Sequence, residues 1–328
     1  PTASGLFKAS TEDFKVDEVL GFELSGVGEH QFLRIEKRGL TTEELMKAIS
    51  KCIEKPMKLI SHAGLKDRQA VTTQWISIHC PGEAIKDIAS LQGDRWRVIE
   101  SKRHSKKLKI GGLQGNRFTL VIRNISSKDA MHERLLLIQK EGVPNYFGPQ
   151  RFGHQGQNMT RAEDVLLKGA RVKDRFLRGI YYSAARSYLF NRILSARVEQ
   201  GTWNKALSGD VMQLAGTHSI FTIDTPDELI LERITNHDVS PASVLWGKGE
   251  SMVHSDALKV QEAALTDLEP WCKALVSHDL VRAYRAHVLY PEDLTWDWVD
   301  DVLTLTFSLT AGGYATSVLR EMMLNADA

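Results

Sequence analysis

The feature that most constrains the fold of this chain is its hydrophobic periodicity, which changes twice along the sequence. Apolar residues alternate in the N-terminal part, recur at helical spacing after Gly142-Val143-Pro144, and alternate again over 302–309. A period of two is typical of half-buried strands, whereas apolar residues three and four positions apart indicate helices. The order indicates a β-rich core, completed by the last strand and helix, with a helical unit inserted in it.

We expect the core to comprise residues 1–141 and 289–328 and the insertion to comprise residues 142–288. Both boundaries lie near prolines, Pro144 and Pro291, as domain boundaries often do. The 328 residues, 42% of them hydrophobic, are enough for a sizeable core of this kind. The predicted fold class is therefore α+β, with a mixed or antiparallel sheet and an inserted, mainly helical domain.

The individual elements follow from the same patterns. Strands are expected at 14–20, 31–37, 71–80, 96–100, 108–110, 118–125 and 302–309. Helices are expected at 41–55, 127–140, 160–168, 181–200, 225–236, 255–278 and 315–325. Thr41 or Thr42 can cap the first helix, and Pro56 should stop it. Gly115-Asn116 predicts a turn before the strand at 118–125.

Composition and cysteine usage narrow the class of protein. No run of 18 apolar residues occurs, so we expect no membrane span. The N-terminus lacks the basic and apolar regions of a signal peptide, and it begins with Pro1, so we expect a short native stretch before it. The three cysteines, Cys52, Cys80 and Cys272, are far apart and form no CxxC, which predicts reduced thiols in a cytoplasmic protein.

Metal and nucleotide motifs are missing from the sequence. The eleven histidines show neither HxH nor HxxxH spacing, so we predict no catalytic metal. There is no GxGxxG and no P-loop, so no nucleotide cofactor is implied.

One segment is strongly basic, although the net charge of the whole chain is only +1. Between Arg95 and Ile110 a single acid, Glu100, faces seven cations: Arg95, Arg97, Lys102, Arg103, Lys106, Lys107 and Lys109. Such a run either lies in a solvated hairpin or binds phosphate. Because the charge is locally unbalanced, we favour phosphate binding, with Lys106, Lys107 and Lys109 as candidate RNA contacts.

The most informative stretch is His62–Trp75, with the sequence HAGLKDRQAVTTQW. Asp67 stands between Lys66 and Arg68, and neighbouring positive charge keeps a carboxylate ionised even when it is partly buried. An ionised, positioned carboxylate can serve as a nucleophile or a base. Taken alone this is a weak signal, because a Lys-Asp-Arg turn is usually an exposed loop.

The segment Gly64–Trp75 resembles the signature of the TruD family of tRNA pseudouridine synthases, in which an aspartate follows Gly-x-Lys and precedes an Ala-Val-Thr-x-Gln strand. Four further stretches resemble family motifs in the same order: Gly5–Phe14, Gly111–Phe118, Gly142–Gly153 and Leu309–Glu321. The resemblance extends over nearly the whole chain. Five long motifs in register are far more specific than one short pattern.

The resemblance implies a pseudouridine-synthase core with a TruD-specific insertion. It implies an isomerase that acts on uridine 13 of tRNA, chiefly tRNA(Glu). We expect no cofactor, no association with a membrane and no obligate protein partner. Asp67 would be the catalytic carboxylate, and Phe14, Asn116 and Tyr314 would contact the uridine. Related bacterial sequences commonly have Phe where this chain has Tyr314, so the ring is kept and a hydroxyl is added. Lys8 and Glu12 resemble family positions near the site. Lys8 would hold the carboxylate ionised, contact phosphate, or be a solvated surface lysine.

Several alternatives remain open at this point. Phe14 and Tyr314, each considered alone, would more often be core residues, and Gly115-Asn116 a plain turn. Asp67 could attack C1′ or C6, or act as a base at the 2′ carbon with a glycal intermediate. An RNA chaperone without chemistry would not need the Asp67 motif. A metal-dependent RNA hydrolase would need clustered carboxylates or histidines, which we do not find.

Overall fold

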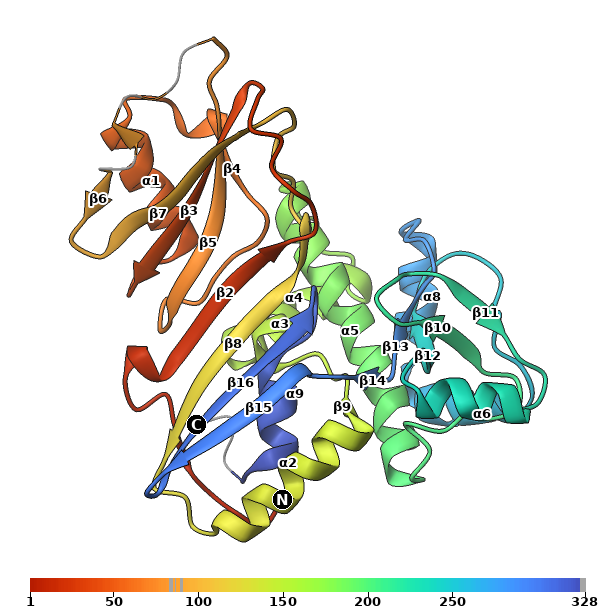
Figure 1. Ribbon diagram of the computed structural model, residues 1–328. Coiled ribbons are helices and arrows are strands. Elements are labelled where there is room, and N and C mark those ends of the chain that lie inside the picture. The colour runs from red at the N-terminus through yellow and green to blue at the C-terminus, as the bar shows by residue number, and fades with distance from the viewer. Residues whose placement is uncertain (83–84, 86, 89–90, 325–328) are drawn as a thin grey trace. The chain divides into compact units, whose positions relative to one another are not determined.

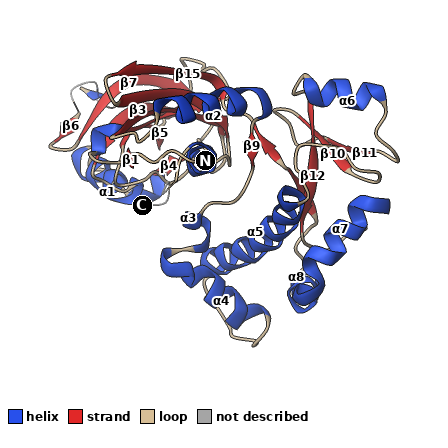
Figure 2. Ribbon diagram, turned by 90° about the horizontal axis from the view of Figure 1, so that it is seen from below, coloured by secondary structure: helices blue, strands red, loops and turns tan. Residues whose placement is uncertain are grey.

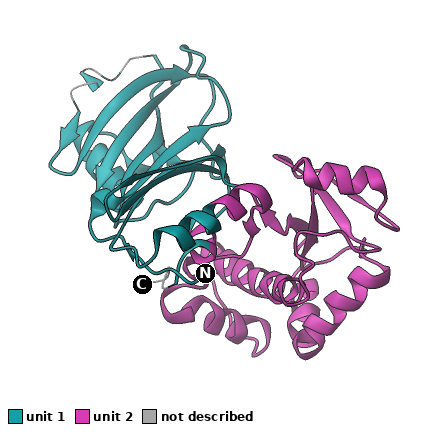
Figure 3. Cartoon of the chain, turned by 60° about the horizontal axis from the view of Figure 1, so that its bottom comes forward, with its two compact units in different colours: residues 1–135, 291–315, 322–328 teal, residues 136–290, 316–321 magenta. Residues whose placement is uncertain are grey.

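The computed structural model describes residues 1–82, 85, 87–88 and 91–324, which fall into two compact units (Figure 3). Unit 1 consists of residues 1–135, 291–315 and 322–328, and unit 2 of residues 136–290 and 316–321. No helix in the described ranges is long and apolar enough to cross a bilayer.

Unit 1 is built on a ten-stranded sheet of order β15-β16-β8-β2-β5-β3-β7-β6, with β1 beside β8 and β4 beside β5 (Figure 1). Its strands are β1 (Leu6–Phe7), β2 (Phe14–Leu20), β3 (His30–Arg38), β4 (Ile60–His62), β5 (Val71–His79), β6 (Gln92–Gly93), β7 (Trp96–His104), β8 (Leu113–Arg123), β15 (Glu292–Val299) and β16 (Val302–Thr310). The pair β2 and β5 is parallel, whereas the neighbouring pairs β2–β8 and β3–β5 are antiparallel. The sheet is therefore mixed, as predicted.

Helix α1 (Thr42–Cys52) covers part of this sheet, because its apolar face packs into the core of unit 1. Leu45 and Ile49 are fully buried against β3 and β5. Thr41 accepts a hydrogen bond from Glu44 N, and the Glu44 carboxylate accepts one from Thr41 N, so the predicted cap is a reciprocal capping box. The helix ends at Cys52, before Pro56 is reached, so the predicted end at residue 55 was too late.

Two other local predictions in unit 1 were wrong. Gly115-Asn116 is not a turn but part of β8, where Gly115 pairs with Thr310 of β16. A Cβ at Gly115 would collide with the carbonyl of Leu309, so the glycine is needed for close approach of two strands. Residues 108–110 form a loop, in which Leu108 is buried and its N–H donates to Ser77 Oγ.

Two helices continue from unit 1 into unit 2. They are α2 (Lys128–Glu141) and α9 (Ala315–Met322). The predicted end of the last helix, Asn325, lies outside the described residues.

Unit 2 contains six further helices (Figure 2). They are α3 (Pro149–Phe152), α4 (Gln157–Leu166), α5 (Arg175–Glu199), α6 (Glu228–Thr235), α7 (Ser255–Leu265) and α8 (Glu269–Ser277). Side chains of α4, α5, α7 and α8 share one apolar core. The helix predicted over 255–278 is broken by a 3-10 turn at Thr266–Leu268. Pro270, which lacks an N–H, lies in the first turn of α8.

Unit 2 also contains a four-stranded antiparallel sheet that the sequence patterns did not predict. Its order is β11 (Ile220–Thr222), β10 (Val211–Leu214), β12 (Val239–Leu245) and β13 (Ala283–Ala286). A separate two-stranded pair consists of β9 (Val143–Pro144) and β14 (Val288–Leu289).

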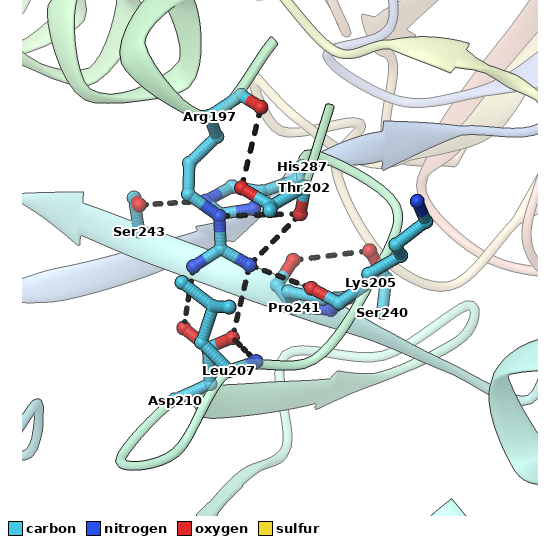
Figure 4. Close-up of polar contacts among 9 residues, drawn as sticks. All are labelled: Arg197, Thr202, Lys205, Leu207, Asp210, Ser240, Pro241, Ser243 and His287. Carbon is cyan, nitrogen blue, oxygen red and sulfur yellow. Dashed lines mark hydrogen bonds and ion pairs between the residues drawn. The ribbon is translucent and has the colours of Figure 1, made fainter. Parts of the chain in front are cut away.

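A buried ion pair fixes the C-terminal end of α5 (Figure 4). The Arg197 guanidinium donates to both carboxylate oxygens of Asp210, at 2.9 and 3.0 Å, and both side chains are at most 3% exposed. The same guanidinium donates to the carbonyls of Thr202 and Lys205. These contacts hold the loop after α5 in one conformation. Removing either partner would leave a buried charge uncompensated.

Candidate active site

Asp67 lies in the loop at 63–70, which joins the antiparallel strands β4 and β5. Val71, the first residue of β5, pairs with Lys15 of β2 on one side and with Arg38 of β3 on the other. The loop therefore leaves the sheet where β2 begins and β3 ends. This topology places the N-terminal segment, which leads into β2, beside Asp67.

Lys8 and Phe14 come from that N-terminal segment. Lys8 Nζ lies 2.9 Å from Asp67 Oδ2 and 4.4 Å from the centre of the Phe14 ring. Lys8 has a φ of 58°, a left-handed conformation that costs a non-glycine residue about 1–3 kcal/mol. Phe14 is only 8% exposed and packs against Phe7 and Phe118. The structure thus brings Lys8, Phe14 and Asp67 together, with Phe14 largely buried.

The Asp67 side chain is 40% exposed, so substrate can reach it. Burial acts to raise the pKa of its carboxyl, but hydrogen bonds from Lys8 Nζ and Gln69 N and the charges of Lys8 and Lys37 outweigh burial, so the pKa lies below its ordinary value. Asp67 is therefore an ionised carboxylate at neutral pH.

The two cations next to Asp67 in the sequence, Lys66 and Arg68, do not keep its carboxylate ionised as the sequence suggested, because both have other partners. Lys66 Nζ forms an ion pair with Glu18 at 2.7 Å, and Arg68 Nε donates to the carbonyl of Gly39. Apart from the Gln69 N–H, which is two residues away, the groups that hold Asp67 ionised are Lys8 and Lys37, both distant in the sequence.

Two buried charged side chains support the loop, and the sequence analysis missed both. Lys37 Nζ donates to the carbonyls of Leu40 and Asp67, at 2.6 and 2.9 Å, and is fully buried. Burial lowers the pKa of Lys37 to about 8. The Glu18 side chain is fully buried, forms the Lys66 ion pair and accepts from Trp75 N; burial raises the pKa of this carboxyl.

A sequence signal for Lys37 does exist. Leu33, Ile35 and Lys37 share one face of β3, and all three are fully buried. A lysine at a core-facing position of an alternating strand is rare unless it has partners.

Asn116 and Tyr314 are placed by strand register. Asn116 lies on β8 opposite Glu18 of β2 and Leu309 of β16. Its Oδ1 is buried and lacks a hydrogen-bond partner within the described part of the chain. Tyr314 is half-buried after a turn in which Ala311 N donates to the carbonyl of Gln114. Asn116 and the segment leading to Tyr314 therefore lie at the same end of β8.

The other expected contact residues have different surroundings. Glu12 forms an exposed ion pair with Arg38 at 3.2 Å. Lys106, Lys107 and Lys109 are exposed in the loop between β7 and β8 and have no ion pair among the residues that the structure describes. These three lysines are available to phosphates.

Over the described ranges, no group of three or more His, Cys, Asp or Glu side chains is arranged to hold a metal ion. What the arrangement around Asp67 provides is one accessible, ionised carboxylate beside an ammonium and an aromatic ring.

Comparison with known proteins gives consistent matches over the whole chain. The model of the family "tRNA pseudouridine synthase D (TruD)" matches residues 1–173 and 157–322. A tRNA pseudouridine synthase D of Legionella pneumophila (strain Corby) is 48% identical over 98% of this chain and 96% of its own. One of Aeromonas salmonicida is 41% identical over 100% of this chain and 93% of its own.

A solved structure shows the same fold. The putative tRNA pseudouridine synthase D from Methanosarcina mazei superposes with a TM-score of 0.73 at 21% identity, covering 98% of this chain and 94% of that one. Together with the family match and the sequence relatives, it leads to one conclusion: the chain belongs to the tRNA pseudouridine synthase D (TruD) family.

Proposed function

We propose that this protein isomerises uridine 13 of tRNA, chiefly tRNA(Glu), to pseudouridine, with Asp67 as the catalytic carboxylate. The observation that carries the proposal is the state of Asp67, an ionised and accessible carboxylate that Lys8, Gln69 N–H and Lys37 fix in place. The relatives named tRNA pseudouridine synthase D support the reaction and the substrate class.

The reaction is an internal transfer that needs no second reactant. The bond between uracil N1 and C1′ breaks, the base rotates, and a bond forms between C5 and C1′. The proton on C5 leaves, and N1 gains one, so atoms and electrons balance. Asp67 attacks C1′ or C6, or removes a proton from the 2′ carbon; each route requires the charged form that Lys8 stabilises.

The uridine must leave its stack to reach Asp67, which costs a few kcal/mol. Tyr314 would stack on the extruded base, and one such stack returns about 1–3 kcal/mol. Asn116, which is half-buried, would contact the uracil edge through its side-chain amide. Phe14 is only 8% exposed, so only the edge of its ring would contact the substrate. The face of the ring would position the Lys8 ammonium.

The chain's organisation completes the proposal. Residues 1–141 and 289–328 would form the catalytic core, and residues 142–288 the TruD-specific insertion. Lys106, Lys107 and Lys109 would contact tRNA phosphates, and Glu12 would support the site by holding Arg38.

One experiment separates this function from its rivals. Unmodified tRNA(Glu) is incubated with the protein in EDTA, its nucleosides are analysed, and modified positions are mapped. Pseudouridine at position 13 is the expected result, and a tRNA(Glu) with cytidine at position 13 should yield none. Binding without modification would indicate an RNA chaperone. Cleavage that returns with added metal would indicate a hydrolase. Pseudouridine elsewhere would refute the assigned position.

A further inference from the structure

A second basic segment, separate from the one at 95–110, lies in unit 2 where α5 begins (Figure 1). It holds four cations within eight residues: Arg171, Lys173, Arg175 and Arg178. We call these four residues, together with Phe176, the α5 patch. Three of the cations are exposed, and Arg178 is half-buried. In a chain whose net charge is +1, such a cluster is a local excess of positive charge.

The cations of the α5 patch are not neutralised by the protein. Among the described residues, none of the four has an ion pair or a side-chain hydrogen bond. Other exposed lysines of unit 2 do have partners. Lys259 is paired with Asp256 at 2.8 Å, and Lys273 with Glu269 at 2.9 Å. The α5 patch thus leaves four cationic side chains available to an anionic partner.

The one acid in the segment does not compensate for this charge, because it has another role. Asp174 caps α5 by accepting from Phe176 N and Leu177 N, at 2.7 and 3.2 Å. Two N–H groups of the helix end are therefore already in use, and the proposed binding relies on the side chains. Cations near the start of a helix oppose its dipole, so the positions of Arg175 and Arg178 do not serve helix stability.

An exposed aromatic ring lies among these cations. Phe176 is 63% exposed, and the adjacent Leu177 is 40% exposed. A phenyl ring in water contributes little to folding, and its flat face is suited to stacking. Cations that track a phosphate backbone, combined with aromatic rings on which bases stack, are the recurring chemistry of single-stranded nucleic-acid binding.

We propose that the α5 patch is an RNA-binding surface, in which the four cations contact phosphates and Phe176 stacks on an unpaired base. The identity of the RNA as tRNA rests on the proposed function. The surface would fix the substrate through its backbone, at a place on the chain separate from the residues that handle the target uridine.

The test is a charge-neutralised variant with a matched control. The variant Arg171→Ala/Lys173→Ala/Arg175→Ala loses three unpaired cations. The control, Lys248→Ala/Lys259→Ala/Lys273→Ala, loses three exposed but ion-paired cations of the same unit. The affinity for unmodified tRNA is measured from low to moderate salt. We expect the first variant to bind at least tenfold more weakly and its log–log salt slope to fall by about two to three, while the control stays near wild type.

Phe176→Ala tests the stacking part separately. We expect tRNA binding to weaken about five- to a hundredfold, as for one lost base–aromatic stack, with a nearly unchanged salt slope and melting temperature. Phe176→Tyr should restore the affinity.

Two results would overturn the proposal. The first is wild-type affinity and salt slope in the triple variant. The second is a triple variant that binds RNA like the wild-type protein but sediments differently from it, which would assign the α5 patch to contacts between proteins. Pseudouridine formation by the wild-type protein is scored independently. If it fails while the salt slope depends on the α5 patch, the proposed function is wrong and the RNA surface stands.

Discussion

The ammonium of Lys8 and the carboxylate of Asp67 lie 2.9 Å apart, although 59 residues separate them in the sequence. The contact exists because β2 and β5 run parallel, so the segment before β2 and the loop before β5 emerge at the same end of the sheet. Lys8 adopts a left-handed backbone conformation at this point. A fixed ammonium beside an accessible carboxylate keeps that carboxylate charged, as the proposed catalysis requires.

The first prediction concerns this pair. Lys8→Met should raise the pKa of the Asp67 carboxyl, because the ammonium now lowers it. In the proposed mechanism only the charged form reacts, so the rate should begin to fall at a higher pH on the acid side. On the acid side of the profile, where Asp67 becomes protonated, each unit by which its pKa rises should lower the single-turnover rate by up to about tenfold. Lys15→Met, at an exposed position of β2, is the control. An unshifted pH profile in Lys8→Met would contradict this role.

The second prediction concerns Asp67 itself. Asp67→Asn keeps the shape of the side chain and its acceptor for Gln69 N–H but removes the charge. Turnover should be abolished while tRNA affinity stays largely intact, since phosphate contacts dominate binding. Single-turnover assays and filter binding on the same preparation measure both. Substantial pseudouridine formation by a homogeneous Asp67→Asn sample would refute the assignment.

The third prediction concerns the buried Lys37. Its pKa is about 8 in the folded protein and near 10.5 when unfolded. Between these values the unfolded chain binds more protons, so the free energy of unfolding rises with pH. Relative to Lys37→Met, the wild-type protein should gain about 3 kcal/mol from pH 8 to 10.5. Urea unfolding at several pH values measures this difference. A difference that does not change with pH would show that Lys37 is not titrating in this window.

The sequence predicted those parts of the fold that depend on local pattern. The alternation of Leu303, Leu305 and Phe307 gave β16, whose apolar side chains are buried. The Thr41–Glu44 capping box was also predictable, because its two partners are three residues apart. Gly115 was misread because the reason for the glycine is the carbonyl of Leu309, which is distant in sequence.

The sheet of unit 2 was missed for a similar reason. Its strands are short, β12 contains Pro241, and their pairing is tertiary: Val211 lies opposite both Thr222 and Ala242. At the candidate site, the resemblance to a family singled out Asp67. The resemblance also placed Lys8 near the site, and one of its expected roles was to hold the carboxylate ionised. The contribution of Lys37 could not be deduced, because Lys37 reaches Asp67 only through the topology of the sheet.

The fourth prediction concerns the exposed lysines between β7 and β8. Reversing Lys106, Lys107 and Lys109 to Glu should weaken tRNA binding and flatten its salt dependence, because fewer counterions are released. The matched control reverses Lys47, Lys51 and Lys58, which are exposed on or just after α1 in the same unit. Affinity is measured against salt for both. If the two triple variants behave alike, the loop is only a solvated surface.

The last prediction concerns Tyr314, the aromatic residue that follows β16. Our proposal uses only the face of its ring, so Tyr314→Phe should retain most activity. Tyr314→Ala should lose about 1–3 kcal/mol of stacking, or roughly five- to a hundredfold in turnover, with little change in tRNA affinity. A core role predicts instead a lower melting temperature, because truncation leaves a cavity. Phe307, which is fully buried and stacks on Phe118, is the reference for such a role. Thermal melts and single-turnover rates decide: a Tyr314→Ala protein as unstable as Phe307→Ala, or a Tyr314→Phe protein as inactive as Tyr314→Ala, would rule out stacking on the uridine.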